Sequence, residues 1–405
     1  MATHRLYYDD SFLHDFSARV LSCTAVSPVP TESGPMPAWE VILDQTACYP
    51  SSGGQPNDLG KLGEARILDV RDEGDEIVHI VDQQLPRGSV DGCVDWVRRF
   101  DHMQQHTGQH LLSAILQERF GLPTVSFHLG SDVCTIDLRG PEPSLDVLRG
   151  AQRAANSAIF EDRPVNVRYG TADQLAQRGV RKQVDREGIL RAIEIEALDL
   201  QPCGGTHVRS TGQIGLLLVR RSAKIRQDWR VEFVCGGRAE HASTTDFYLL
   251  RSVGDRLTCS PDEALAAIDK SASDRDAAVK NFRAAIEQLA EAHAKLMIAA
   301  APPADNGVRC VSALLQEESP ELLLPLATNL AKNENTVALL GHEPTGQLVF
   351  AQSMAAAVDL SAILKQLLAA IPGKGGGTRD FVRAKLVEPN HSNGALTLAK
   401  QFVAG

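Results

Sequence analysis

Residues 99–120 read RFDHMQQHTGQHLLSAILQERF, and the fold class follows from the different patterns before and after this segment. Its apolar residues recur at helical spacing, and Gly121 and Pro123 end the helix. Upstream, residues 18–94 run in short β-rich pieces broken by Pro, Gly and Asp, a pattern typical of a small barrel. Downstream, strands and helices alternate. The sequence therefore predicts an α+β fold in which this helix follows an N-terminal β-barrel.

Four segments are expected along the chain. The long Ala-, Glu- and Lys-rich run after residue 260 predicts one helix or a hairpin of two, and the alternating strands and helices of the last hundred residues predict a small α/β unit. The predicted segments are a β-barrel domain (1–95), an α+β core (96–250), a helical linker (255–303) and a C-terminal α/β domain (304–405).

Composition narrows the class of protein. The chain has 405 residues, of which 43% are hydrophobic and 23% charged, as in ordinary globular proteins. A net charge of -10 argues against a protein that binds polyanions through its overall charge. A local basic strip on such an acidic chain could still bind nucleic acid. Eight scattered cysteines, no secretory leader and no long apolar run predict a cytoplasmic protein without a membrane segment.

The histidines of the central helix indicate a metal site. His102, His106 and His110 lie four residues apart, so they project from one face of the helix. About ninety residues later, Cys203 and His207 are also four apart, in a glycine-containing loop. Two histidines from a helix with a cysteine and a histidine from a loop form the tetrahedral N/S set that zinc prefers.

At this point the sequence resembles a known family, the alanyl-tRNA editing proteins, which are freestanding relatives of the editing domain of alanyl-tRNA synthetase. The matching motifs are YPSSGGQPNDLG (49–60), QQHTGQHLLSA (104–114), VSFHLGSDVCTIDL (125–138), CGGTH (203–207) and KIRQDWRVEFVCGGRA (224–239). PGKGGGTRDFVRA (372–384) is similar to the C-terminal domain found in alanyl-tRNA synthetase and in DHH-type phosphoesterases. The resemblance covers nearly the whole chain, as in the long form of the family, and makes the segment 96–250 its editing core.

This resemblance implies a function and a ligand set. His106, His110, Cys203 and His207 occupy the zinc-ligand positions, and His102 lies outside the pattern. Because the chain starts directly at the barrel, without an aminoacylation module, the resemblance implies an enzyme that edits in trans. The implied substrate is tRNA(Ala) mischarged with serine, with glycine as a second candidate.

Editing makes physical sense for such a substrate. A pocket built for alanine rejects an analogue with one extra hydroxyl by only about 10²-fold, whereas a second site that requires the hydroxyl can discriminate by about 10⁴ to 10⁵. A zinc ion could activate water or position the substrate, and four protein ligands slightly favour positioning. The pocket residues expected from the resemblance are Gly54, Gln55, Thr135 and Asp137; Gln55 would contact the terminal adenosine or aminoacyl group, and Thr135 would help to read the hydroxyl.

Two basic segments are expected to contact tRNA. The first is a strip of arginines and a lysine that suits phosphate contacts. The second is a glycine-rich segment whose exposed amides, together with a lysine, could cradle an anion. The predicted tRNA-binding residues are Arg220, Arg221, Lys224, Arg226 and Arg230, and Gly373, Lys374, Gly375, Gly376 and Gly377. The resemblance also implies that the C-terminal domain contacts the tRNA body or forms a homodimer.

Two other functions stay open from the sequence. The chain could deacylate another aminoacyl-tRNA, since threonyl-tRNA synthetase carries a related editing domain. It could also be a catalytically inactive tRNA-binding protein with a structural zinc. Phosphoesterase chemistry in the C-terminal domain is not expected, because the sequence contains no DHH triplet.

Overall fold

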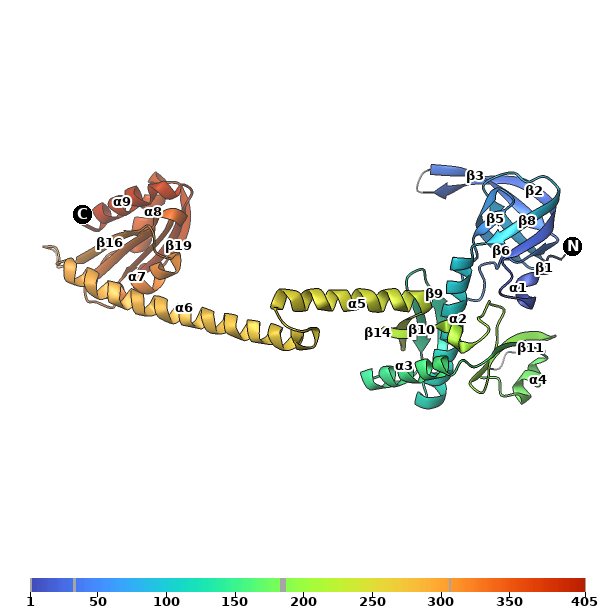
Figure 1. Ribbon diagram of the computed structural model, residues 1–405. Helices are drawn as coiled ribbons and strands as arrows, with labels where there is room; N and C mark the ends of the chain where they lie inside the picture. Colours follow the sequence, from blue (N-terminus) through green and yellow to red (C-terminus); the bar gives the residue numbers. More distant parts are fainter. Residues whose placement is uncertain (1, 32–33, 183–186, 306, 405) are drawn as a thin grey trace. The chain divides into compact units, whose positions relative to one another are not determined.

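The chain folds into two compact units, residues 1–252 and 253–405. The computed structural model describes residues 2–31, 34–182, 187–305 and 307–404 (Figure 1). Each unit combines sheets and helices around apolar clusters of its own, so the predicted α+β class is confirmed. The finer division into four segments stays a prediction.

The first unit begins with a six-stranded closed barrel, whose strands are drawn in blue in Figure 1. Its strands follow one another around the barrel as β2, β3, β7, β6, β5 and β8, and β8 pairs again with β2. Val41, Leu43 and Leu62 are fully buried in its interior. The elements of this part are β1 (His4–Arg5), α1 (Leu6–Asp9), β2 (Asp15–Thr31), β3 (Gly34–Leu43), β4 (Gln45–Thr46), β5 (Gly60–Leu62), β6 (Ala65–Glu73), β7 (Glu76–Val81) and β8 (Gly88–Val94).

Helix α2 (Trp96–Phe120) leads from the barrel into the rest of the unit (Figure 1). The Asp95 side chain accepts a hydrogen bond from Arg98 N and caps its start, and Gly121, in the left-handed conformation, ends it. All residues from 105 to 116 are buried, whichever way they face. A helix covered on all sides is a central element, and α2 is the scaffold on which the first unit positions its histidines.

Two antiparallel sheets surround α2. One has the strand order β14-β15-β10-β9 and the other β11-β12-β13. Helix α3 packs on α2 and on β14 through a face of small and aliphatic residues. The elements are β9 (Thr124–Leu129), β10 (Cys134–Leu138), α3 (Leu145–Phe160), β11 (Val165–Gly170), α4 (Ala172–Gln177), β12 (Leu190–Ile195), β13 (Asp199–Pro202), η1 (Thr211–Ile214), β14 (Leu217–Ile225), β15 (Asp228–Cys235) and α5 (Gly236–Leu257).

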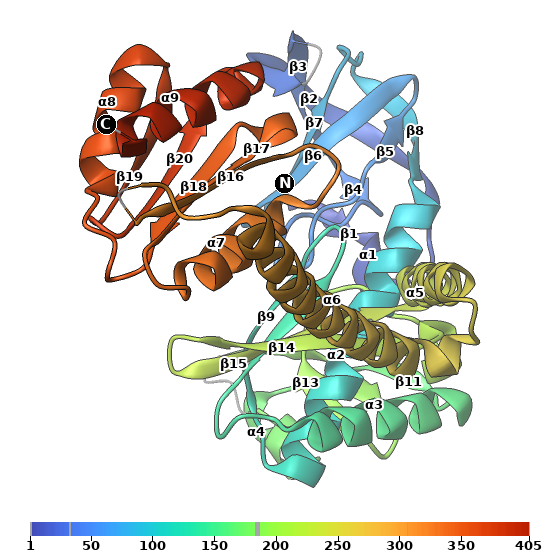
Figure 2. The same cartoon turned by 90° about the vertical axis from the view of Figure 1, so that its left-hand side faces the viewer.

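The second unit is a five-stranded sheet, β16-β17-β18-β20-β19, covered on both faces (Figure 2). Strand β17, an interior strand of this sheet, is buried throughout, and its alternate residues belong to two apolar clusters. Val337 and Leu339 pack with α8 and α9, whereas Ala338 and Leu340 pack with α7 and the end of α6. The elements are η2 (Pro261–Glu263), α6 (Ala264–Ala300), β16 (Arg309–Leu315), η3 (Pro320–Leu322), α7 (Leu323–Ala331), β17 (Thr336–His342), η4 (Glu343–Thr345), β18 (Gln347–Gln352), α8 (Leu360–Ala370), β19 (Gly373–Gly377), β20 (Phe381–Leu386), η5 (Pro389–His391) and α9 (Ser392–Ala404).

Two features of the second unit refine the sequence predictions. The Ala-rich segment forms the single helix α6 and not a hairpin of two. The glycine-rich segment, expected as an anion-cradling loop, is the edge strand β19. A Cβ at Gly375 would lie 2.5 Å from Arg383 O on β20, so glycine is required there for close strand pairing. Among the described residues, no helix is both long and apolar enough to cross a membrane.

Candidate metal centre and substrate cavity

Helix α2 presents His106 and His110 on one face, one turn apart. Both side chains are buried in the first unit, and their ring centroids are 5.2 Å apart. His102, one turn earlier, is also buried but does not belong to the cluster. The sequence-based expectation that His102 lies outside the site therefore agrees with the structure.

The loop after β13 brings Cys203 and His207 to the same point. The imidazole of His207 lies 4.4 Å from that of His106, measured between ring centroids. A Cβ at Gly205 would come within 2.2 Å of His106 Cε1. Only glycine lets the loop backbone pass this close to the helix.

The four side chains converge on a common centre. Their potential ligand atoms all lie within 4.8 Å of one another. Cys203 Sγ is 3.4 Å from His106 Nε2 and 3.3 Å from His207 Nε2. A tetrahedral zinc ion with ordinary bond lengths separates its N and S ligands by roughly 3.5 Å. The donor set and its spacing therefore fit zinc.

The tautomer of His207 is set by a helix hydroxyl. Thr107 Oγ1 donates a hydrogen bond to Met103 O at 2.8 Å, so its oxygen accepts the proton of His207 Nδ1, 3.1 Å away. Nδ1 of His207 is thus the protonated nitrogen. The lone pair is left on Nε2, the atom that faces Cys203 Sγ.

His106 is oriented in the same way by Gln55. Gln55 Oε1 accepts from His106 Nδ1 at 2.9 Å and from the backbone N–H of Thr206 at 3.1 Å, while Gln55 Nε2 donates to Thr206 Oγ1 at 2.8 Å. All of these groups are buried. One amide therefore joins His106 on the helix to the loop that carries Cys203 and His207, two more of the four candidate ligands.

The third histidine pairs with a carboxylate. His110 Nδ1 lies 3.2 Å from Asp199 Oδ2, and Arg181 Nε donates to Asp199 Oδ1 at 2.7 Å. Ligand histidines in metal sites usually donate their second nitrogen to such an outer partner, which fixes the ring and strengthens the ligand. Each of the three imidazoles in this cluster has such an outer partner: Gln55 for His106, Asp199 for His110 and Thr107 for His207.

The electrostatics of the cluster favour a thiolate. Burial opposes ionisation of Cys203, but the imidazoles of His106 and His207 outweigh it and hold the pKa of the thiol well below its usual value. Burial also disfavours the charged form of His110, yet Asp199 and Cys203 raise the pKa of His110 to about 9. Burial and the charge of His106 lower the pKa of His207 to about 3. Because the thiolate is the form that binds metals, the cluster is prepared for one.

A cavity of about 470 Å³ opens directly at this cluster. His106, His110 and Cys203 form part of its wall. Its remaining lining comes from the barrel loop, from α2, β9 and β13, from the segment before β12 and from the loop after β13: Tyr49, Ser52, Gly53, Gly54, Gln109, Thr124, Val125, Ser126, Phe127, Arg181, Lys182, Gln201, Pro202, Gly204 and Gly205. This volume is in the range of small-molecule sites.

Comparison with known proteins identifies the family. A family model described as the threonyl and alanyl tRNA synthetase second additional domain matches residues 190–232, which contain the Cys203–His207 loop. The alanyl-tRNA editing protein Aarsd1-A of Xenopus laevis is 32% identical over 317 residues, covering 76% of each chain. The chain belongs to the alanyl-tRNA editing proteins.

Two further relatives match nearly the whole chain. The alanyl-tRNA editing protein AlaX-L of Pyrococcus horikoshii is 29% identical over 399 residues, covering 94% of each chain. The alanine--tRNA ligase of Pyrococcus abyssi is 29% identical over 413 residues, which are 97% of this chain and 43% of the ligase. The similarity therefore includes both units.

The structure divides the predicted pocket residues of the editing protein into two groups. Gly54 lines the cavity, whereas Gln55 is 2% exposed and lies behind His106, with both ends of its amide bonded within the protein. Thr135 and Asp137 share one face of β10, as predicted, but neither is among the lining residues. Gln55 therefore supports a ligand, a role that the sequence did not indicate.

Asp137 reaches the cavity only through a neighbour. Arg230 donates to both carboxylate oxygens at 2.8 and 3.0 Å, and Ser126 Oγ donates at 2.6 Å. The hydrogen bond from Arg230 outweighs the effect of burial and lowers the pKa of Asp137. Ser126 itself lines the cavity, so Asp137 fixes a hydroxyl at its edge.

The predicted basic strip lies on the hairpin of β14 and β15. Three of its five residues form ion pairs: Arg220 with Asp246, Arg221 with Glu232, and Arg230 with Asp137. Lys224 and Arg226 have no carboxylate partner among the described residues. The second predicted group, Gly373, Lys374, Gly375, Gly376 and Gly377, lies on β19 of the other unit, away from the metal cluster in the sequence and in a separate core.

Sequence reasoning missed the outer partners of the ligands. Thr107 directly follows His106, and Asp199 lies four residues before Cys203. Hydroxyl and carboxylate groups next to metal ligands are a usable signal, since histidine ligands commonly need such partners. Arg181 carried no signal, because its contact with Asp199 depends on how the chain returns to β13.

Proposed function

We propose that this chain is a zinc-dependent aminoacyl-tRNA deacylase that acts in trans on tRNA(Ala) mischarged with serine, with the glycine-charged form as a second candidate substrate. The observation that carries the proposal is the convergence of His106, His110, Cys203 and His207, each imidazole with an outer hydrogen-bond partner, at the wall of a cavity. The names of the relatives, alanyl-tRNA editing proteins, support the substrate class.

The roles of the residues follow from their contacts. A zinc ion held by the four ligands would supply Lewis-acid chemistry at the ester carbonyl or lower the pKa of a water molecule. Gln55, Thr107 and Asp199 hold the ligand rings in place. The cavity walls would orient the aminoacyl end, which is how a site gains rate from position alone.

The polar edge of the cavity supports selection of serine. Ser126 lines the cavity and is tied to Asp137, which in turn is held by Arg230. A hydroxyl fixed in this way offers a partner that a seryl group can satisfy and an alanyl group cannot. In this proposal Asp137 acts through Ser126, and Thr135 lies one position further along the same face.

A second hollow beside the cavity suits the 3′ strand of tRNA. It has a volume of about 590 Å³ and shares Val125 and Ser126 with the first cavity. Its lining also includes Arg226 and Arg230 and two carboxylates, Asp137 and Asp228, which are paired with Arg230 and Arg139. Arg226, at the turn between β14 and β15, is exposed and without a carboxylate partner among the described residues. Cationic side chains along such a path attract phosphates. We therefore assign Lys224 and Arg226 to phosphate contacts.

The test is a deacylation assay on the full chain. Ser-tRNA(Ala) and Gly-tRNA(Ala) are compared with Ala-tRNA(Ala) and Thr-tRNA(Thr), and the zinc content of the same sample is measured. We expect rapid loss of serine, intact alanine and threonine, and about one zinc per chain. Loss of glycine as well would add Gly-tRNA(Ala) as a second substrate. Zinc without hydrolysis would make the chain a tRNA-binding protein with a structural metal, and hydrolysis of Thr-tRNA(Thr) alone would assign it to the threonine system.

The variant Cys203→Ala tests the ligand set. Removing the thiolate takes away one of four donors, so zinc content and deacylation should both be lost. The matched control is Cys93→Ala, at an exposed position in the barrel. Full zinc content and unchanged activity in Cys203→Ala would contradict the assignment.

A further inference from the structure

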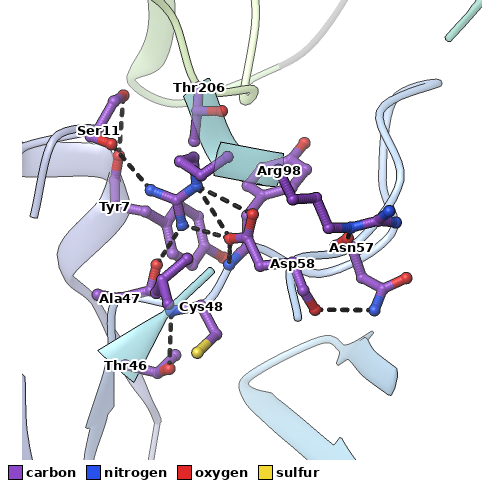
Figure 3. Close-up of polar contacts among 12 residues, drawn as sticks. Tyr7, Ser11, Thr46, Ala47, Cys48, Asn57, Asp58, Arg98 and Thr206 are labelled. Carbon is purple, nitrogen blue, oxygen red and sulfur yellow. Dashed lines mark hydrogen bonds and ion pairs between the residues drawn. The ribbon is translucent and has the colours of Figure 1, made fainter. Parts of the chain in front are cut away.

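A fully buried ion pair lies between the barrel loop and helix α2. Neither the Asp58 nor the Arg99 side chain is exposed at all. Arg99 Nε donates to both carboxylate oxygens of Asp58 at 3.0 Å, and its terminal nitrogens donate to Ser11 O at 2.8 Å and Ala47 O at 2.6 Å. Figure 3 labels three of these partners, Ser11, Ala47 and Asp58.

Asp58 also closes the loop that carries Gln55. Tyr49 N donates to Asp58 Oδ2 at 2.6 Å, and Asp58 N donates to Tyr49 O at 2.9 Å, so the two ends of loop 49–58 are tied together. At the tip, Ser52 and Gln55 exchange backbone hydrogen bonds across a two-residue turn. Both turn residues, Gly53 and Gly54, have positive φ, as such turns require.

The loop and the helix are therefore joined at two places. The first is the Asp58–Arg99 pair, next to which Arg98 Nε donates to Asn57 O at 3.0 Å. The second is the hydrogen bond between Gln55 and His106. Arg99 and His106 are seven residues apart, two turns of the helix or about 10 Å. The ion pair holds loop 49–58 on α2, and it thereby fixes the position of the Gln55 amide relative to His106.

Stability alone does not account for the pair. Burying two charges costs several kcal/mol for each ion, and apolar replacements are often neutral or stabilising, so a buried pair is weak evidence for a contribution to stability. It does fix orientation, because a bidentate contact with backbone acceptors around it permits one arrangement. Arg99 fulfils this condition through Ser11 O and Ala47 O.

We propose that Asp58 and Arg99 are positioning residues for the metal centre, acting through Gln55 on His106. This inference rests on the proposed metal site. Weakening the pair would let loop 49–58 shift on α2, and the Gln55 amide would no longer hold His106 Nδ1. Loss of an outer partner of a ligand typically lowers metal affinity by 10- to 100-fold.

The experiment uses the metal-free full chain and Co²⁺ as the probe. Variants Arg99→Lys and Asp58→Asn are titrated with Co²⁺ in competition with a chromophoric chelator, and the thiolate-to-cobalt absorption band is recorded. Arg66→Lys is the matched control, because Arg66 pairs with Asp82 at 2.6 Å on the barrel, outside the loop. We expect 10- to 100-fold weaker Co²⁺ binding and a changed absorption band in the two test variants, and no change in the control.

The outcomes separate this inference from the metal site itself. A wild-type chain that binds no Co²⁺ would overturn both. Wild-type affinity and an unchanged band in folded Arg99→Lys and Asp58→Asn, whatever their unfolding midpoint, would overturn the positioning role alone. If Arg99→Lys does not fold, Asp58→Asn decides, because its side-chain oxygen still accepts the hydrogen bond from Tyr49 N.

Discussion

Asp199 shows how much of the metal centre depends on a residue that is not a ligand. Its carboxylate holds His110 Nδ1 and is itself held by Arg181. The burial of Asp199 would raise its pKa, but His110 and Arg181 outweigh this and lower it. The carboxylate is therefore ionised and available to His110 at neutral pH.

Replacing this carboxylate should weaken the centre without removing a ligand. Asp199→Asn loses the charge that favours Nδ1–H of His110, so zinc affinity should fall by about 10- to 100-fold. Competition with a chelator measures the change, and Asp91→Asn, an exposed barrel position bonded to Ser17, is the control. Equal affinity in Asp199→Asn and wild type would show that His110 needs no outer carboxylate.

A buried histidine in the barrel should make stability depend on pH. His79 lies between Thr46 Oγ1 at 2.9 Å and Val41 O at 3.3 Å, and burial lowers the pKa of His79 to about 4. Since the unfolded chain has the higher pKa, it takes up the proton first as the pH falls. The free energy of unfolding should therefore drop between about pH 6.5 and 4, by roughly 3 kcal/mol from this residue.

Urea unfolding at several pH values measures this effect. The variant His79→Gln should lack the part of the loss that comes from His79, roughly 3 kcal/mol between pH 6.5 and 4, whereas His128→Gln, at an exposed position of the same unit, should keep it. A pH dependence that is the same in all three proteins would assign the acid sensitivity to other groups.

At the scale of elements, the turn of loop 49–58 offers a matched pair of substitutions. Gly53 and Gly54 both have positive φ, but a Cβ at Gly53 meets nothing within 4 Å, whereas one at Gly54 lies 2.8 Å from the Phe127 ring. Phe127 in turn packs on His106 at 5.6 Å between centroids. The turn therefore touches the centre through a side chain as well as through Gln55.

Gly53→Ala should cost about 1 to 2 kcal/mol of stability, the price of a left-handed residue. Gly54→Ala should cost roughly 2 to 4 kcal/mol and also lower deacylation, because the ring of Phe127 must move at the cavity wall. Chemical unfolding and single-turnover deacylation measure both. Equal effects of the two changes would mean that the Phe127 ring moves away from a Cβ at position 54 at no measurable cost in free energy.

The elements that the sequence predicted well are those with local patterns. The four-residue spacing of His106 and His110 and the apolar repeat after them belong to one helix, so α2 and two ligands could be predicted from short range. Contacts between residues far apart in the sequence could not be predicted in this way. Asp199 and Arg181 meet because β13 passes α2, and GKGGG became a strand because β20 offers it an edge. A glycine run carries no periodicity that distinguishes a strand from a loop.

At the scale of the whole molecule, the chemistry and the second core are separate. All four ligands and every residue that lines the cavity belong to residues 1–252, whereas β19 with its glycines belongs to residues 253–405. The walls described above are therefore built by the first unit itself. Its contribution should appear in binding and not in the chemical step.

A variant that ends at Leu257, the last residue of α5, separates the two contributions. We expect the rate on saturating Ser-tRNA(Ala) to stay within about threefold, and KM to rise at least about tenfold as the tRNA contacts of the second unit are lost. Steady-state kinetics and a direct tRNA-binding titration measure this. An unchanged KM would assign the second unit to assembly, and sedimentation would then show its loss in the truncated chain.

The amide of Gln55 joins segments that are 151 residues apart in the chain, and it reaches His106 as well. Contacts of such long range form late in folding, since closing a long disordered loop costs conformational entropy that other contacts must first offset. The metal centre can therefore assemble only when barrel, helix and sheet are already in place. Metal uptake during refolding would then follow the completion of the first unit, and a newly made chain would become competent for editing only at that last step.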